Sequence, residues 1–590
     1  MSQIPVNRAH ISEFIHFEDE AQGIETSASD LPDYQWSMIP PDLRAGELRT
    51  TWSSQVKEVH ELQTTTQRIP KDSAEALRQQ TCYIPSKIYG SEEFKSRIRD
   101  VCNKHIRCFN TRLGADSALV RPMTLQVDEA KWCVNSNKGP PRAQTLEKQA
   151  EVEKQVLEML KNGIISTSTA EYYSQVHLTP KPVAGLNPLE NKPSPDNFAE
   201  HLPDYATTSS KSNISTKAKN GWRFCIDFRN LNACSKGIGG HIPNIRHLMQ
   251  RLGSKKPKRM GKLDLTSGYH QTPLARESRH WTAFITHLGV FEWNRVVMGQ
   301  KGAGTWFQSM LATVVLLGLM YIMCELYIDD LIIFADSEDQ FIEHLDTVLG
   351  RLVLHKVTVN PDKCVLGVQE VEFVGHVINE KGLSHTREKL DKILQIPPPT
   401  LGKDLKSFLG VAIWVCDHIR NYSTIVHPLH QMIKNYSRER RLVWTQEARD
   451  AFEELKIAIN GCTLLYFLDE VSEIKLYTDA TDFGIGGFLC QLVGGKELPI
   501  AFVSHSLSEQ EINWSTIEKE CYAIVFCLDK LNYVLDGRRF TLKTDHKNLT
   551  FLDADKNPKV RRWKIGIQHY DCIIEYIKEV TTSLPILCQG

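Results

Sequence analysis

The sequence contains no apolar run long enough to cross a membrane as a helix. The stretch MLATVVLLGLMYIMC (310–324) is strongly apolar, but it is shorter than the roughly 20 residues that a spanning helix requires. The first residues, MSQIPVNRAHISEF, lack the apolar segment of a secretory signal. These absences predict no membrane partner, and they favour a buried helix that leads into a buried strand at 310–324.

The sequence also lacks cysteine pairs at zinc-binding spacing and a large net charge. The 15 cysteines are scattered, and the spacing of Cys102 and Cys108 in CNKHIRC fits neither a zinc finger nor a zinc knuckle. We expect mostly buried thiols in a reducing compartment. The formal net charge of −1 neither favours nor excludes nucleic acid, because a nucleic-acid enzyme needs only local basic surface.

The amino-acid composition is typical of a soluble globular protein. Hydrophobic residues make up 41% and charged residues 24% of the 590 positions, and this length predicts roughly four domains of about 150 residues. Residues 1–90 are polar and predict a poorly defined, partly disordered segment, and 183–220 predict an inserted loop. A proline run at 397–399 marks a breakpoint, 400–460 favour helices, and a strand-rich unit begins near Ile474.

Hydrophobic periodicity predicts the elements between these boundaries. Helices are expected at about 145–164, at 303–319, after a Ser337 N-cap, and at 515–531. Strands are expected at 174–182 and 221–232, a strand–turn–helix at 262–274, and hairpins at 282–298, with Gly289 in the turn, and at 371–383.

Two adjacent aspartates, Asp329 and Asp330, lie between the apolar arms of ELYIDDLIIFAD. Neighbouring side chains of a regular strand point to opposite faces, so both acids can serve one site only at the tip of a tight hairpin. Two carboxylates that close repel each other unless a cation lies between them, and Mg²⁺ prefers such ligands. Asp264, at the end of a short apolar strand in KLDLTSGYH, would supply the third acid of a two-metal site for phosphoryl displacement.

Each acid also has a purely structural interpretation. Asp329 and Asp330 could be turn residues, and Asp264 could be a helix N-cap. Taken singly, these interpretations are the more common ones. The motifs that lie between and around the acids argue against them.

These motifs resemble the reverse transcriptases of gypsy-class long-terminal-repeat retroelements (Metaviridae). YIDD is similar to their Tyr-x-Asp-Asp box, DLTSGYHQ to the first palm motif, and MGQKGAGTWFQ (298–308) to the next. VNPDKC (359–364) and FVGHVI (373–378) resemble the later palm and primer-grip motifs. The resemblance runs in order from about 95 to 580, and five motifs in order are specific.

The resemblance implies roles for individual residues. Asp264, Asp329 and Asp330 would hold two Mg²⁺ ions, with Mn²⁺ as an alternative. Tyr269 would be the steric gate that selects deoxynucleotides. The cations Lys181 and Arg223 would contact the incoming triphosphate, and Lys363 the leaving pyrophosphate. From the residues alone, a solvated strand charge at Arg223 and a loop lysine at Lys181 are the favoured interpretations. Gln300 and Gly304 depart from the family pattern.

A second set of acids follows. Asp479 lies in IKLYTDATDFGIGG, Glu520 in the helix STIEKECYAIVFCLDKL, and Asp545 ends the strand FTLKTD. This order resembles the ribonuclease H domain that follows gypsy-class polymerases, where three such acids bind metal. We interpret Glu518, in the same helix, as a solvated charge instead.

The fourth acid that the family pattern carries is replaced. Pro585 stands at its expected position in the tail EVTTSLPILCQG, which predicts a shortened domain with weakened ribonuclease H turnover. Two basic runs, 253–262 and 556–570, would contact nucleic acid, the second with Trp563 and Tyr570 interleaved, although the first is equally typical of a solvated charge run.

These inferences predict an α+β multidomain fold. Residues 91–385 would form the fingers and palm of a right-hand polymerase, 386–470 the thumb and connection, and 471–590 a ribonuclease H-like α/β domain. The expected function is RNA-directed DNA polymerisation in a cytoplasmic or nuclear retroelement setting. The expected partners are an RNA template, a DNA primer, an RNA–DNA hybrid and deoxynucleoside triphosphates, and a homodimer is compatible with the resemblance. The alternatives are a decayed or domesticated copy that binds nucleic acid without turnover, and an RNA-dependent RNA polymerase.

Overall fold

The computed structural model describes residues 82–114, 116–180, 221–434, 441–462, 464–469, 471–547 and 557–577. The predicted disordered segment 1–90, apart from its last residues, and the inserted loop 183–220 lie outside them. Within the described ranges no helix combines the length and the apolar character that a bilayer span requires.

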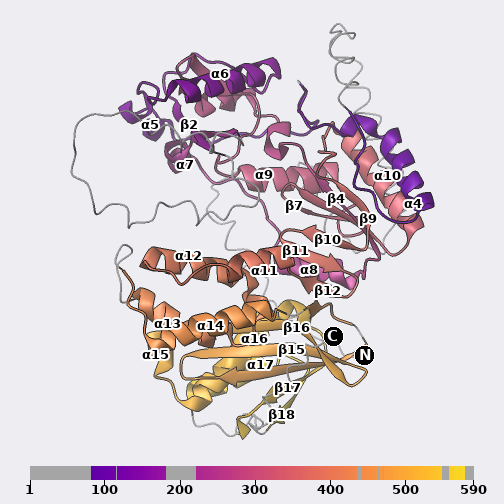
Figure 1. The fold of residues 1–590 in the computed structure, drawn as a ribbon, viewed down its shortest axis with the longest axis vertical. Helices are drawn as coiled ribbons and strands as arrows, with labels where there is room; N and C mark the ends of the chain where they lie inside the picture. Colours follow the sequence, from indigo (N-terminus) through magenta and orange to yellow (C-terminus); the bar gives the residue numbers. More distant parts are fainter. Residues whose placement is uncertain are drawn as a thin grey trace, which may run out of the picture. The chain divides into compact units, whose positions relative to one another are not determined.

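A five-stranded sheet, here called the fingers sheet, has the order β1-β6-β5-β2-β3. The amphipathic helix α6 (Leu146–Lys161) packs on it through Val152 and Val156 (Figure 1). The helix predicted at 145–164 and the hairpin at 282–298 are thereby confirmed, the latter with Gly289 at φ 125°. The strands are β1 (Ile165–Thr167), β2 (Ser174–Pro180), β3 (Trp222–Asp227), β5 (Phe284–Thr286) and β6 (Gly289–Trp293), and the short helices here are α5 (Glu129–Trp132) and α7 (Arg229–Cys234).

The palm sheet has the order β7-β8-β4-β9 and is covered on both faces. Alternation along β8 places Leu331 and Ile333 in one core and Ile332 in another, which explains why its sequence is a continuous apolar run. Helices α4 and α10 lie side by side against the first core (Figure 1). The bounds are α4 (Glu92–Lys104), α8 (Ile245–Ser254), β4 (Arg259–Asp264), β7 (Cys324–Tyr327), β8 (Asp330–Ala335), α10 (Glu338–Leu354) and β9 (Val365–Val368).

The helix predicted at 303–319 is too long. Helix α9 covers Ala303–Met310, and one wider turn, η9 (Leu311–Val315), completes it. Leu316 leaves the helical region and Gly318 adopts φ 79°, so the chain turns toward β7 earlier than the apolar periodicity indicates. The Ser337 N-cap is confirmed, since its side chain accepts a hydrogen bond from the Gln340 N–H.

A small sheet and a helical layer follow the palm sheet. The hairpin predicted at 371–383 is confirmed, and the sheet has the order β10-β11-β12-β13. The helices share one core that includes Phe408 and Phe452. The bounds are β10 (Glu370–Phe373), β11 (His376–Asn379), β12 (Gly382–Ser384), β13 (Leu465–Tyr466), α11 (Arg387–Leu394), α12 (Gly402–Ala412), η10 (Ile413–His418), α13 (Tyr422–Lys434) and α14 (Gln446–Asn460).

The last sheet has the order β16-β15-β14-β17-β18, with β14, β17 and β18 parallel. Helices α16 and α17 pack on it around Leu476, Ile524 and Leu542. The bounds are β14 (Glu473–Ala480), β15 (Gly484–Val493), β16 (Lys496–Ser506), α15 (Glu509–Ile512), α16 (Thr516–Leu535), β17 (Phe540–Thr544), α17 (Pro558–Ile567) and β18 (Cys572–Tyr576).

Candidate active sites

The Asp pair lies at a tight hairpin, as the sequence predicts. Tyr327 at the end of β7 is opposite Asp330 at the start of β8, so only Ile328 and Asp329 form the turn. Ile328 adopts φ 56°, a left-handed conformation that is strained for a β-branched residue. The surrounding structure must therefore hold this turn in place.

A buried glutamine, Gln308 of α9, holds it. Its Oε1 accepts a hydrogen bond from the Ile328 N–H, and its Nε2 donates to the Leu326 carbonyl at 3.2 Å. Gln308 is 2% exposed. The sequence motifs predict no individual role for Gln308, although an amide side chain on the apolar face of a helix is itself a signal of a specific partner.

Asp264 joins the pair through strand register. In the antiparallel pairing of β4 with β8, Asp264 is opposite Asp330, and the Leu265 N–H donates to the Asp329 carbonyl at 3.3 Å. The interpretation of Asp264 as a helix N-cap is wrong, because Ser267 occupies that position before the 3₁₀ turn η7 (Gly268–Gln271). Three carboxylates from two segments, the end of β4 and the β7–β8 hairpin, thus gather at one end of the palm sheet.

The charges of these acids interact with one another and with two lysines. Partial burial first, then the charges of Asp330 and Asp264, raise the pKa of Asp329. Lys363 Nζ lies 3.1 Å from an Asp264 oxygen, and Lys262 Nζ lies 2.9 Å from an Asp330 oxygen. Lys262 was missed in the sequence, although it precedes Asp264 by two positions on the same strand face.

Tyr269, the predicted gate, lies in η7 next to this cluster. Its ring centroid is 5.3 Å from that of Phe307, and burial followed by the charge of Asp329 raises the pKa of its hydroxyl. A Cβ at position 304 would lie 3.3 Å from the Tyr269 hydroxyl oxygen. The departure from the family pattern at Gly304 therefore leaves room beside this hydroxyl.

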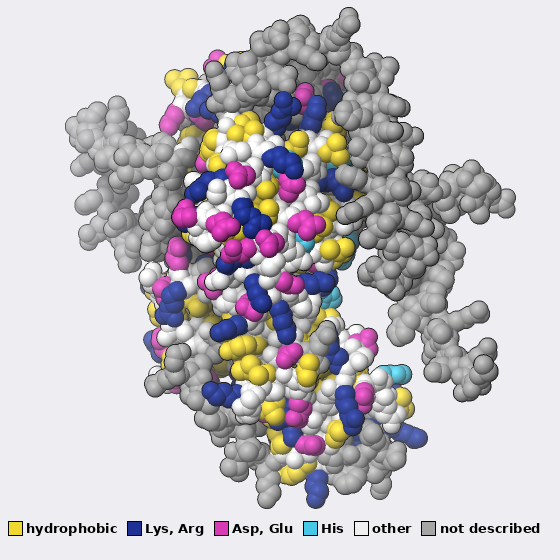
Figure 2. Space-filling model, turned by 90° about the vertical axis from the view of Figure 1, so that its right-hand side faces the viewer, with side chains coloured by type: hydrophobic (Ala, Val, Ile, Leu, Met, Phe, Trp, Pro, Cys, Tyr) yellow, Lys and Arg dark blue, Asp and Glu magenta, His cyan; other side chains and the backbone are white. Residues whose placement is uncertain are grey.

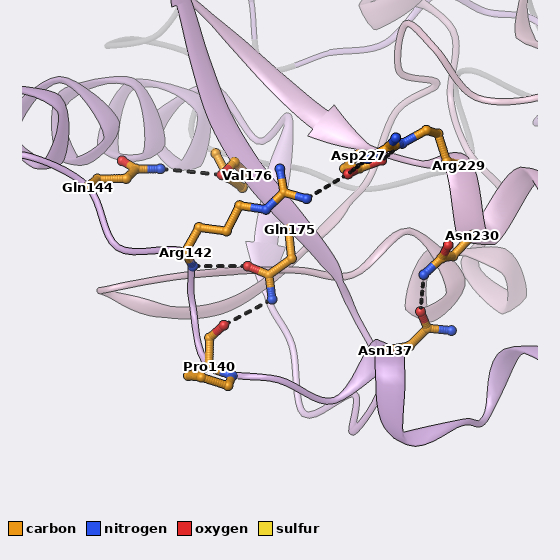
Figure 3. A network of polar contacts seen from close by, with 9 residues as sticks. All are labelled: Asn137, Pro140, Arg142, Gln144, Gln175, Val176, Asp227, Arg229 and Asn230. Atoms are coloured by element: carbon orange, nitrogen blue, oxygen red, sulfur yellow. Dashed lines mark hydrogen bonds and ion pairs between the residues drawn. The ribbon is translucent and has the colours of Figure 1, made fainter.

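The fingers sheet carries Arg223 as an exposed side chain on β3, whereas Lys181 lies outside the described residues. Figure 3 shows the segment before α6 bound to this sheet: Arg142 pairs with Asp227 at 2.7 Å, and the Arg142 N–H donates to Gln175. Arg229 first, then Arg142, lower the pKa of Asp227. These contacts fix the strand that presents Arg223.

The second acidic set is brought together from two parallel strands and a helix. Asp479 lies near the end of β14, Asp545 directly follows β17, and Glu520 lies in the second turn of α16. One carboxylate oxygen from each lies within 4.8 Å of the others. The palm acids are not among the described groups that meet this spacing; instead, Lys262 pairs with Asp330 and Lys363 pairs with Asp264.

Glu520 is the most perturbed member of this set. Its side chain is 3% exposed, and its Oε2 has no hydrogen-bond partner. Burial first, then the charges of Asp545 and Asp479, raise its pKa to about 8. A buried oxygen without a partner beside two further carboxylates fits a divalent cation, which would supply the missing charge.

The interpretation of Glu518 as a solvated charge is wrong. Its carboxylate accepts hydrogen bonds from the Ser515 N–H and hydroxyl, which completes a capping box at the start of α16. Lys559 Nζ lies 3.7 Å from it. Glu518 therefore fixes the helix that presents Glu520.

The two predicted basic runs differ in exposure. In the run 556–570, Arg561 and Arg562 are exposed, but Lys564 is 2% exposed and faces the core. Lys559 Nζ lies 3.0 Å from the centroid of the Trp514 ring. In the run 253–262, several cations already pair with acids: Lys256 with Asp469, Arg259 with Glu338 and Lys262 with Asp330.

The surface carries both signs of charge. On the face drawn in Figure 2, Lys and Arg side chains are interspersed with Asp and Glu, which agrees with the small net charge. Contact with nucleic acid must therefore depend on local groups of cations. Pro585, at the position of the fourth acid, lies outside the described residues.

Comparison with protein families matches both parts of the chain. Residues 211–378 match the model described as reverse transcriptase (RNA-dependent DNA polymerase), and residues 469–570 match the RNase H-like domain found in reverse transcriptase. The predicted resemblance is thereby confirmed in both the palm and the last domain.

Curated relatives are retrovirus-related Pol polyproteins of Drosophila melanogaster. The polyprotein from transposon 412 is 30% identical over 82% of this chain and 36% of its own length. The polyproteins from transposons opus and gypsy are 31% and 32% identical over 72% and 60% of this chain. The chain spans between 35% and 40% of the length of these relatives.

Solved structures share the fold. The foamy viral protease-reverse transcriptase in complex with an RNA/DNA hybrid aligns with a TM-score of 0.65 at 20% identity, covering 88% of this chain and 64% of that one. The same viral protein in complex with dsDNA aligns with a TM-score of 0.65 at 19% identity, covering 89% and 99%. The expected α+β fold, a right-hand polymerase followed by a ribonuclease H-like domain, is confirmed.

Proposed function

We propose that this chain, whose residues 211–378 and 469–570 match a reverse transcriptase and an RNase H-like domain, is part of a gypsy-class retroelement polyprotein that copies RNA into DNA and hydrolyses the RNA of the resulting hybrid. The observation that carries the polymerase part is the register of Asp264 opposite Asp330, with Asp329 in the adjoining turn. Acids so placed can share the phosphates of an incoming nucleotide through bound cations.

Asp264, Asp329 and Asp330 would hold Mg²⁺, with two ions at the site and Mn²⁺ as a substitute. Such ions, when bound, activate the attacking hydroxyl and stabilise the leaving oxygen in an in-line displacement. The raised pKa of Asp329 and the lysines on its neighbours support this assignment. Lys262 and Lys363 each pair with a carboxylate oxygen. A bound cation would replace the lysine at that oxygen.

The displaced lysines would then be available to contact the phosphates of the substrate. Lys363, whose side chain is 62% exposed, would neutralise the departing pyrophosphate, and Arg223 on β3 would contact the triphosphate, as would Lys181. Tyr269 would exclude the ribose 2′-hydroxyl, because its ring is fixed by Phe307 beside Asp329. Together these groups favour a deoxynucleoside triphosphate.

The nucleic-acid partners would be an RNA template, a DNA primer and their hybrid. The foamy viral relatives were solved with a hybrid and with dsDNA, which supports the assignment. The exposed Arg561 and Arg562 of α17 would contact phosphates of the duplex. Recognition would follow the backbone and the A-like shape of the duplex, not its sequence.

The ribonuclease H part depends on Asp479, Glu520 and Asp545. Their spacing and the orphaned Glu520 oxygen support cation binding. Because Pro585 replaces the fourth acid of the family pattern, we expect slower hydrolysis than a four-acid site would give. Hydrolysis of a labelled hybrid before and after Glu520→Gln measures this activity apart from polymerisation.

Primer extension on an RNA template with Mg²⁺ and deoxynucleotides tests the polymerase proposal. Product should vanish with Asp329→Asn and persist with Asp336→Asn, a control at an exposed residue that directly follows β8 at its other end. Chelation of Mg²⁺ should abolish extension as well.

The other outcomes separate the alternatives. Template binding without extension by the unmodified chain would support a decayed copy and overturn the proposal. Equal use of ribonucleotides in a competition assay would favour an RNA polymerase and contradict the role of Tyr269.

A further inference from the structure

A cluster of three histidines, here called the histidine triad, lies outside both acidic sites. His376 begins β11, His385 follows the last residue of β12, and His418 ends η10. One ring nitrogen from each lies within 4.8 Å of the others. The triad thus joins the hairpin after the palm sheet to the helical layer.

The triad is buried and incompletely bonded. His385 is 9% exposed and His418 is 5% exposed. Both ring nitrogens of His385, and Nδ1 of His376, are buried without a hydrogen-bond partner. One imidazole with two unpartnered buried nitrogens is costly unless a ligand binds it.

Packing alone does not account for these nitrogens. The His385 ring lies 4.3 Å from His418, 5.1 Å from His376 and 4.2 Å from Trp414, measured between centroids. Aromatic side chains packed in a core need no ring nitrogens, and a phenyl ring would fill this space without leaving polar atoms unpaired. Three ring nitrogens within 4.8 Å of one another are what a bound ion requires.

The chemistry of the triad selects a class of ion. Neutral imidazole binds Zn²⁺ and similar transition-metal cations, whereas Mg²⁺ prefers oxygen. Burial is the main cause that lowers the pKa of His376 and of His385. The nearby cation Lys389 is already bound to Glu372 and to the Gly375 carbonyl.

We propose that His376, His385 and His418 bind a transition-metal ion, Zn²⁺ in the first instance, that ties the β11–β12 hairpin to η10. Zinc–nitrogen bonds of about 2.0–2.1 Å in tetrahedral geometry place ligand nitrogens roughly 3.4 Å apart, so modest rotation of the rings closes the triad. Three protein nitrogens leave a fourth position for water or another ligand. The ion would hold two segments 42 positions apart in the chain (418 minus 376).

The hairpin concerned includes the motif FVGHVI, which resembles the primer grip. His376 is the histidine of that motif. A bound ion would therefore fix the hairpin against the helical layer and keep its position constant while the polymerase moves along a duplex. This inference depends on the geometry of the triad and not on polymerase activity, so the two can fail separately.

Direct metal binding tests the proposal. The full-length, untagged protein is stripped with a chelator and titrated with Co²⁺ in excess Mg²⁺, which occupies the acidic sites. One equivalent of Co²⁺ should give the visible absorption of a tetrahedral nitrogen-ligated ion, and Zn²⁺ should displace it. Absence of this absorption in the wild-type protein would overturn the proposal.

Variants locate the ion. His385→Asn and His418→Asn should each lose the Co²⁺ absorption, whereas His287→Asn, an exposed histidine of the fingers hairpin, should keep it. Glu520→Gln should also keep it, because its site is separate. Zn²⁺ should raise the thermal unfolding temperature of the wild type but not of His385→Asn, and retention of full Co²⁺ binding by that variant would place the ion elsewhere.

Discussion

The buried carboxyl of Glu520 predicts that cation binding to the ribonuclease site releases a proton. Its pKa is raised to about 8, mainly by burial and then by Asp545 and Asp479. A group with this pKa is about 90% protonated at pH 7, and metal ligands bind in their deprotonated form. We therefore expect roughly 0.9 protons released per cation at pH 7, about 0.5 at pH 8 and about 0.1 at pH 9.

Calorimetric titration with Mg²⁺ in two buffers of different ionisation enthalpy measures this release. The titration is best made in an Asp264→Asn background, which suppresses binding by the palm acids. The apparent affinity should also rise about tenfold per pH unit below pH 8. Proton release near zero at pH 7, or release that is equal at pH 7 and pH 9, would refute the reasoning.

The same group links stability to pH. The ordinary pKa of a glutamic acid is 4.5, and the folded value is about 8, so the native state holds a proton that the unfolded chain has lost between these values. Without cations, stability should therefore fall as pH rises through this window. The ceiling is about 5 kcal/mol, from 3.5 pH units at about 1.4 kcal/mol each.

Glu520→Gln removes this titration. In chelator, the variant should be more stable than the wild type at pH 8 and nearly equal to it at pH 5, measured by thermal unfolding of the last domain. Added Mg²⁺ should stabilise the wild type and reduce the difference. Parallel pH profiles of the two proteins would contradict the assignment of the raised pKa.

Three further substitutions test single contacts. Gly304→Ala places a methyl group 3.3 Å from the Tyr269 hydroxyl and should alter the preference for deoxynucleotides over ribonucleotides in a competition assay; an unchanged preference would show that this ring does not act as the gate. Gln308→Ala leaves the Ile328 N–H without its acceptor and should lower the free energy of unfolding by about 1–3 kcal/mol, read from urea denaturation. Ser515→Ala breaks the capping box of α16 and should cost about 0.5–2 kcal/mol in the same measurement.

Local chemistry made much of the fold and of the candidate sites predictable from the sequence. Apolar arms around two acids predict a hairpin, and Asp329 lies in its turn. The resemblance selects Glu520 over Glu518, because the family's glutamate precedes an apolar helix run, and the structure buries Glu520 while Glu518 caps the helix. In these two cases the signal is contiguous in the sequence.

The remaining contacts depend on register and on distant packing. Lys262 reaches Asp330 only because β4 pairs with β8 in one register, which no local pattern specifies. The end of α9 was predicted too late because the following residues are apolar for a different reason, burial in the palm core. The histidine triad joins the β11–β12 hairpin to η10. The sequence carries no spacing pattern that predicts His385 as a member.

Each acidic site is assembled from a short stretch of chain. Asp264 and Asp330 are 66 positions apart (330 minus 264), and Asp479 and Asp545 are also 66 positions apart (545 minus 479). Contacts of low sequence separation form quickly, and chains fold from the N-terminus during synthesis. The polymerase centre can therefore take shape on the ribosome before the ribonuclease segment has been translated.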